Sequence, residues 1–87
     1  MDQPSIKTLD TDPEYRAAVV DLLAVLAYGA LTAFERIAAD AAMAPTVDDK
    51  AALAGMATSE YRHFETLRDR LIELGVSPEV AIAPFRQ

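Results

Sequence analysis

The chain has 87 residues, 52% of them hydrophobic, and it carries a formal net charge of -6 and no cysteine. This composition is too apolar for a disordered chain, and the missing cysteines exclude a disulfide framework, a thiolate metal site and a cysteine nucleophile. The acidic balance argues against unspecific binding to nucleic acid or to anionic membranes. The length fits one small domain or a part of one.

The N-terminal segment, residues 1–12, shows no sustained hydrophobic period, and we expect an irregular arm there. It also lacks the apolar core of a secretory signal. The uncharged run from Leu22 to Phe34 is shorter than the roughly 20 residues that a bilayer core requires, and Asp21 and Glu35 close it at both ends. The sequence therefore predicts a cytoplasmic protein without a membrane span.

The first helix is expected to begin at Asp12-Pro13-Glu14. Asp suits the N-cap, Pro suits the first helical position, and Glu suits the positive end of the helix dipole. Nothing after this point breaks the helix before about Met43 except a tolerable glycine at position 29. Pro45 then ends it.

A second helix is expected to begin at Thr46, because Asp48 and Asp49 follow in its first turn. It should run to about Leu74, and Gly75 is typical of the residue that closes a helix. Residues 13–75 thus form two helices of about 30 residues joined by a tight turn, which is a long antiparallel hairpin in an all-α fold. Residues 76–87 are expected to form an extended connector that leaves room for one helical turn at 78–81.

The predicted hairpin does not cover its own apolar surface. The first helix is apolar almost all round between Ala17 and Phe34, and a helix of that kind is buried on more than one side. Two helices cannot provide this for each other. We therefore expect another hairpin, either from a second copy or from a further part of the same chain.

Three polar residues interrupt the predicted apolar faces. On the second helix the inward stripe is expected to contain Glu60 and His63, among Leu53, Met56, Phe64, Leu67, Leu71 and Leu74. On the first helix, Glu35 shares a face with Tyr28, which could donate a hydrogen bond to it, and with Leu31, Thr32, Ala38, Ala39 and Ala42. A turn near Pro45 brings Glu35 level with residues 56–58, less than one helical turn from Glu60.

A divalent metal ion would resolve the burial of two carboxylates and an imidazole, because an unpaired buried ion costs several kcal/mol. Glu60 and His63 are three residues apart and so lie on one helix face, where both could reach one ion. Simpler explanations stay open. His63 could be a hydrogen-bonded core residue, and Glu35 could form an ion pair with Arg62 or Arg68.

The segments AYGALTAFERIA and ATSEYRHFETLRDRL resemble the ferritin-like di-iron carboxylate superfamily. They look most like bacterial ferritin-like proteins related to tRNA-modifying hydroxylases, and then like rubrerythrin-like proteins. The resemblance covers residues 13–75 and matches the first half of the family's four-helix pattern, with Glu35 as the single Glu and Glu60-x-x-His63 as the paired motif. It implies a four-helix bundle completed by dimerisation or by a second half.

The resemblance further implies a metal-binding protein, with Glu35, Glu60 and His63 as ligands and two iron ions in each completed bundle. Manganese or zinc are alternatives. The expected activity is that of a di-iron oxidoreductase of the hydroxylase or ferroxidase type, acting on oxygen or peroxide. The expected partner is a second copy, and direct binding of nucleic acid is not expected. The competing hypothesis is a non-catalytic dimerisation module, or an inactive half-bundle, with a buried Glu/His network.

Overall fold

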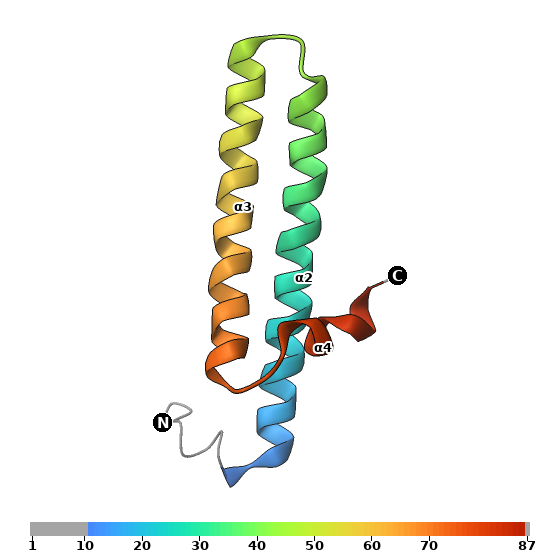
Figure 1. The fold of residues 1–87 in the computed structure, drawn as a ribbon, viewed down its shortest axis with the longest axis vertical. Helices are drawn as coiled ribbons and strands as arrows, with labels where there is room; N and C mark the ends of the chain where they lie inside the picture. Colours follow the sequence, from blue (N-terminus) through green and yellow to red (C-terminus); the bar gives the residue numbers. More distant parts are fainter. Residues whose placement is uncertain (1–10, 87) are drawn as a thin grey trace.

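The computed structural model describes residues 11–86 as two long antiparallel helices followed by a short helical segment (Figure 1). Helix α2 spans Pro13–Met43 and helix α3 spans Val47–Glu73. Helix α4, Pro78–Ile82, and the 3-10 turn η1, Ala83–Phe85, complete the described chain, which contains no strand. The predicted all-α hairpin is confirmed, whereas residues 1–10 of the predicted arm lie outside the described part.

Both long helices begin at the predicted caps. The Asp12 side chain accepts a hydrogen bond from the Tyr15 amide at 3.1 Å, and the Thr46 hydroxyl accepts one from the Asp49 amide at 3.0 Å. Each bond satisfies a backbone N–H that the first turn of a helix leaves without a partner. After α3, Gly75 adopts a positive φ of 77°, which glycine reaches without steric cost, and the chain reverses there.

Cationic side chains join each end of the hairpin to the opposite helix. At the connecting turn, Lys50 Nζ donates hydrogen bonds to the carbonyls of Ala41 and Ala42, at 3.3 and 2.9 Å. At the other end, Arg16 Nη2 donates to the Leu74 carbonyl, where α3 finishes. Both contacts satisfy C-terminal carbonyls at the negative end of a helix dipole. Together they fix how the two helices align along their length.

The seam between α2 and α3 is built mainly from alanine. The buried residues are Ala24, Ala27, Ala30, Ala57, Leu67, Leu71 and Ile82, and Leu71 is the largest fully buried side chain among those described. Small side chains let two helix backbones approach closely, so the helices pack tightly over a core that contains few large groups. The hairpin is narrow for this reason.

The C-terminal segment is more helical than predicted, because the sequence left room for only one helical turn at 78–81 in an otherwise extended connector. Residues 78–85 are helical, and Ser77 caps α4 by accepting a hydrogen bond from the Val80 amide at 3.3 Å. Figure 1 shows α4 crossing α2, and Ile82 and Phe85 pack against the core residues Ala24, Ala27 and Leu67. The apolar side chains of this segment explain the correction, because they are buried only when the chain folds back onto the hairpin.

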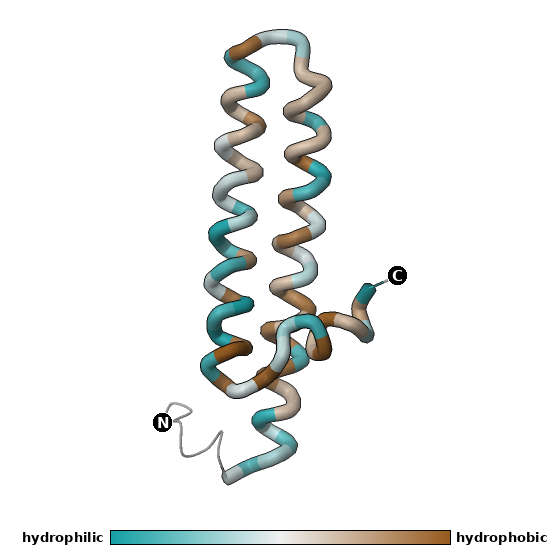
Figure 2. The backbone as a smooth tube through the Cα atoms, in the orientation of Figure 1, coloured by the Kyte–Doolittle hydropathy of each residue, from teal (hydrophilic) through white to brown (hydrophobic). Residues whose placement is uncertain are grey.

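Much of the apolar surface of α2 stays uncovered. An 18-residue stretch of this helix has a mean hydropathy of 2.0 and is only 17% buried, so α2 is long and apolar enough by composition to cross a membrane. Figure 2 shows hydrophobic residues recurring along its length. The radius of gyration is 16.3 Å, whereas a compact domain of this length has a value of about 12 Å. The hairpin is therefore more elongated than a compact domain of its length, and the apolar surface of α2 remains exposed along it.

Candidate functional site

The two predicted glutamates lie at the same level along the hairpin. The rings of Phe34 and Tyr61, which adjoin Glu35 and Glu60 in the sequence, have centroids 5.4 Å apart. This contact places Glu35 and Glu60 within one helical turn of each other along the helix axes, in agreement with the separation predicted from the length of the turn. The level along the axis is therefore as expected.

The orientation of α3 about its own axis differs from the prediction, as the exposure of two residues shows. Met56 is 55% exposed and His63 is also exposed, whereas Ala57 is buried in the seam. Phe64, one residue after His63, packs against the core. The inward stripe thus passes through residues 53, 57, 60, 64, 67 and 71. The predicted burial of Met56 and His63 is wrong because the close approach of the helices selects the small Ala57.

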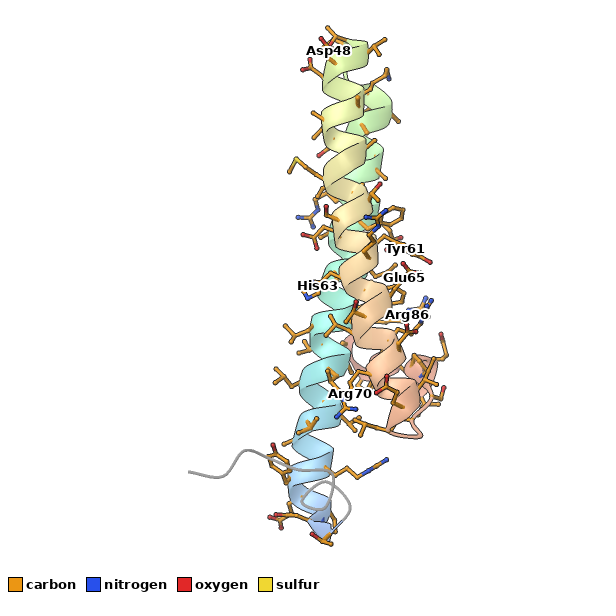
Figure 3. The ribbon with its side chains drawn as sticks, turned by 90° about the vertical axis from the view of Figure 1, so that its left-hand side faces the viewer. Asp48, Tyr61, His63, Glu65, Arg70 and Arg86 are labelled. Carbon is orange, nitrogen blue, oxygen red and sulfur yellow. The ribbon has the colours of Figure 1, made fainter. Side chains whose placement is uncertain are left out.

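Glu35 and His63 occupy opposite sides of the hairpin. Glu35 is exposed and lines a cleft together with Phe64 and Arg86, whereas Figure 3 shows His63 pointing away from the side that carries Glu65 and Arg86. No three His, Asp or Glu side chains come together to hold a metal ion anywhere in residues 11–86. One hairpin therefore does not assemble Glu35, Glu60 and His63, and their role as ligands stays a prediction.

The side that carries His63 is apolar and uncovered. Leu26 lies about 160° around α2 from Tyr28, and His63 lies about 140° around α3 from Arg68, by the rotation of a regular helix. We call the surface formed by Leu22, Leu26, Met56 and His63 the open face. Leu22 is 58% and Leu26 is 46% exposed. Half-buried Glu60 lies at its edge, three residues before His63.

The opposite side contains a cleft of about 720 Å³ between α2, α3 and the C-terminal segment. Its apolar lining consists of Tyr28, Leu31, Phe34, Phe64, Pro78 and Ile82. Its charged lining consists of Glu35, Arg68, Glu79 and Arg86. The volume lies within the range of small-molecule sites, which combine an apolar wall with a few polar groups.

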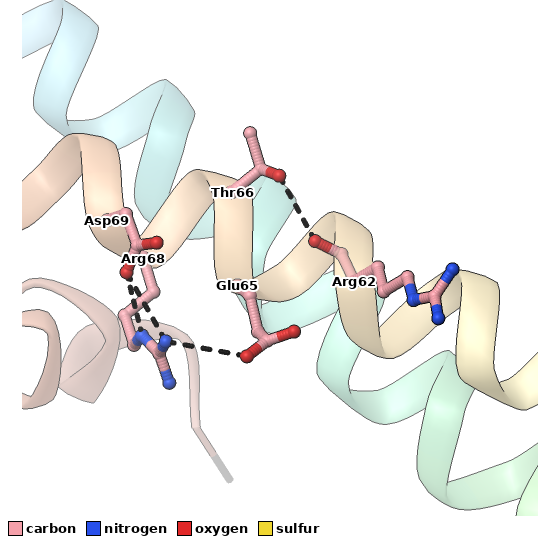
Figure 4. A network of polar contacts seen from close by, with 5 residues as sticks. All are labelled: Arg62, Glu65, Thr66, Arg68 and Asp69. Atoms are coloured by element: carbon pink, nitrogen blue, oxygen red, sulfur yellow. Dashed lines mark hydrogen bonds and ion pairs between the residues drawn. The ribbon is translucent and has the colours of Figure 1, made fainter.

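Arg68 is held by groups on its own helix. It donates two hydrogen bonds of 3.3 Å to Asp69 and approaches Glu65 at 3.8 Å (Figure 4). Its guanidinium group also lies over the Phe64 ring, 5.6 Å from the ring centroid. The hydrogen bond to Asp69 is the main cause that raises the pKa of Arg68 above its ordinary value, against a lowering by desolvation. These contacts replace the ion pair with Glu35 that the sequence left open.

The remaining charged residues of the cleft differ in whether they form ion pairs. Arg86 and Glu79 form an ion pair of 3.1 Å. Glu35, by contrast, makes no hydrogen bond or ion pair with any residue in the range 11–86, and Tyr28 does not donate to it. The sequence did not indicate this cleft, because one wall comes from α4 and that segment was expected to be extended. The apolar side chains of Ile82 and Phe85, which pack against the core, were the available signal.

The profile of a family described as a ferritin-like domain of actinomycetes matches residues 13–87 of this sequence. The match includes α2, α3 and the helical C-terminal segment, so it treats the hairpin and the segment that packs on it as one unit. No curated protein matches the chain.

Proposed function

The chain belongs to the ferritin-like domain family of actinomycetes, and from this premise we propose that it acts as a half-bundle. Two copies associate through their open faces into a four-helix bundle in the cytoplasm, and the bundle holds metal ions between the copies. Glu60 and His63 from each copy are the ligands we assign to this site. The fold is that of the family, whereas the assembly and the metal are the content of the proposal.

The open face is the observation that carries the proposed assembly. Leu22 and Leu26 of α2 and Met56 of α3 are each about half exposed, and the most apolar stretch of α2 is only 17% buried. Burying apolar surface contributes about 25 cal/mol for each Å² removed from water. A second hairpin is the partner with matching length and apolarity, and antiparallel helices of equal length pack along their whole seam.

The metal assignment rests on the chemistry of the ligands. Glu60 and His63 lie three residues apart on α3, at the edge of the face that association would bury, and His63 has no hydrogen-bond partner within residues 11–86. Two copies would bring together two carboxylates and two imidazoles, a set suited to iron, manganese or zinc. Bound iron would supply oxygen or peroxide activation. Glu35 is not part of this set in a single hairpin, whose described residues do not fit a complete di-iron site.

A second candidate function is a non-catalytic dimerisation module. The opposite placement of Glu35 and His63 favours it, because the family's ligand set is then divided between two surfaces. In this function Glu60 and His63 would form a polar network across the interface that fixes which residues of the two copies meet. The two candidates share the assembly and differ in the metal.

The decisive experiment measures solution mass and bound metal on the same sample. The protein is incubated with Fe²⁺, Mn²⁺ or Zn²⁺ under exclusion of oxygen and desalted, and mass is determined by light scattering and metal by elemental analysis. We expect a dimer that retains metal. Replacement His63→Ala should abolish metal retention while the dimer persists, because the apolar contacts remain.

The matched control is Glu14→Gln, which removes an exposed carboxylate in the first turn of α2, far along the helix from the level of Glu60 and His63, and should change neither quantity. A monomer at all concentrations, or a chain that needs detergent to stay in solution, would contradict the assembly. A dimer that retains no metal would overturn the metal assignment and leave the dimerisation module as the function.

A further inference from the structure

We propose that the cleft beside α4 binds a small amphipathic organic cation, an aryl- or alkylammonium compound, with Glu35 as the anionic contact. This inference concerns the side of the hairpin opposite to the open face. It rests on the shape and the charges of the cleft and does not depend on dimerisation or metal binding.

The charges of the cleft determine the sign of the ligand. Four carboxylates line or adjoin it, Glu35, Glu65, Asp69 and Glu79, against the two guanidinium groups of Arg68 and Arg86. Both arginines already have carboxylate partners, at 3.3 Å for Arg68 and 3.1 Å for Arg86. Glu35 is the charged lining residue without a partner in residues 11–86. An anion would have to displace existing pairs, whereas a cation finds a free carboxylate.

The apolar and aromatic lining of the cleft determines which uncharged groups the ligand carries beside its ammonium group. Leu31 and Ile82 supply aliphatic surface, and Tyr28 and Phe34 supply aromatic rings beside Glu35. The ring of Phe64 already has the Arg68 guanidinium over it at 5.6 Å. Aromatic faces attract organic cations through the negative potential of the ring, so Tyr28 can assist Glu35 in holding an ammonium group. The apolar body of the ligand then lies against Leu31 and Ile82.

The test uses three probes of equal shape: 2-naphthylethylammonium, the corresponding neutral alcohol, and the corresponding carboxylate. Binding to the whole chain is followed by calorimetry and by NMR shifts of the aromatic protons of Phe34 and Phe64. We expect the cation to bind most tightly and the carboxylate least. Added salt should weaken the cation most, because part of its affinity is electrostatic.

Glu35→Gln keeps the shape of the side chain and removes its charge. Because Glu35 is exposed, its ion pair with a ligand is worth about 1 kcal/mol, which corresponds to about fivefold weaker binding of the cation, with the alcohol unaffected. The control Glu14→Gln removes an exposed carboxylate at the start of α2 and should leave all three affinities unchanged.

The cation should bind His63→Ala as it binds the original chain, which separates this inference from the proposed metal site. Tightest binding of the carboxylate, an unchanged cation affinity in Glu35→Gln, or the absence of shifts at Phe34 and Phe64 would each overturn the inference. Circular dichroism of Glu35→Gln shows whether the variant retains the helical fold.

Discussion

The two sides of the hairpin are built from the same pair of helices but differ in what covers them. On one side α4 and η1 fold back, bury Ile82 and leave a cleft in which most charges are paired. On the open face, Leu22, Leu26 and His63 are exposed, and His63 has no hydrogen-bond partner within residues 11–86. The difference shows that a short C-terminal segment can cover one side of an apolar helix while the other side stays exposed.

The largest effect is expected on the covered side. Ile82→Ala should lower the free energy of unfolding by about 3 kcal/mol, because Ile82 is only 7% exposed and its removal leaves a cavity against Ala24 and Ala27. Urea denaturation measures this loss, which should be independent of protein concentration. Val80→Ala, at a side chain that is 69% exposed on the same helix, should cost less than about 0.5 kcal/mol. Equal losses would show that α4 does not pack as described.

On the open face, the corresponding change should affect association. Leu26→Asp places a charge in the proposed interface, and we expect the dimer dissociation constant to rise at least about tenfold, or about 1.4 kcal/mol. Sedimentation over a range of concentrations measures this constant. The same substitution should leave the helix content of the monomer nearly unchanged, because Leu26 is already exposed in a single hairpin. Unaltered association would place the interface elsewhere.

Gly75 lies in the turn between α3 and α4, and through this turn the chain reaches the covered side of the hairpin. Gly75→Ala should destabilise the protein by about 1 kcal/mol, the cost of a left-handed conformation for an L-residue. Within residues 11–86, no atom apart from those of Gly75 and its two chain neighbours lies within 4 Å of the added methyl group, so we assign the loss to the backbone conformation. Thermal unfolding measures it. Gly29→Ala, in the middle of α2 with equally open space, should instead stabilise the protein slightly.

Lys50 belongs to neither side, and its replacement should have the smallest effect. Lys50→Met keeps the apolar stem and removes the hydrogen bonds to the Ala41 and Ala42 carbonyls, at a cost of about 0.5 kcal/mol. The cost should shrink at high salt, and parallel denaturation curves at low and high ionic strength test this. A salt-independent loss would assign the effect to packing.

Local signals determined what could be predicted of the fold. The caps Asp12 and Thr46 and the closing Gly75 fixed the ends of both long helices, because each acts within a few residues. The triplet Ser77-Pro78-Glu79 carries the same signature as Asp12-Pro13-Glu14, yet the prolines around it favoured an extended interpretation. A helix as short as α4 depends on packing against α2, which local sequence does not reveal.

The levels of the candidate site residues along the helix axes could be predicted from the sequence. The directions in which these residues face around the axes could not. The length of the turn set the level of Glu35 and Glu60, and the contact between Phe34 and Tyr61 confirms it. The rotation of α3 depended on whether Met56 or Ala57 enters the seam. Hydrophobicity favours the larger side chain, whereas an alanine-rich partner helix favours the smaller one. That choice turned His63 outwards and left the metal ligands as a prediction.

The turn at Gly75 also makes the two broad surfaces of the hairpin different from each other. Two antiparallel helices joined by a turn have two broad surfaces of similar size. These surfaces differ in exposure only because the chain beyond α3 packs against one of them. The turn at Gly75, with its positive φ, and the packing of Ile82 and Phe85 against α2 together decide which surface the C-terminal segment covers. We expect a substitution that redirected this turn to displace α4 and so to change which surface of the hairpin is exposed, without altering a residue of that surface.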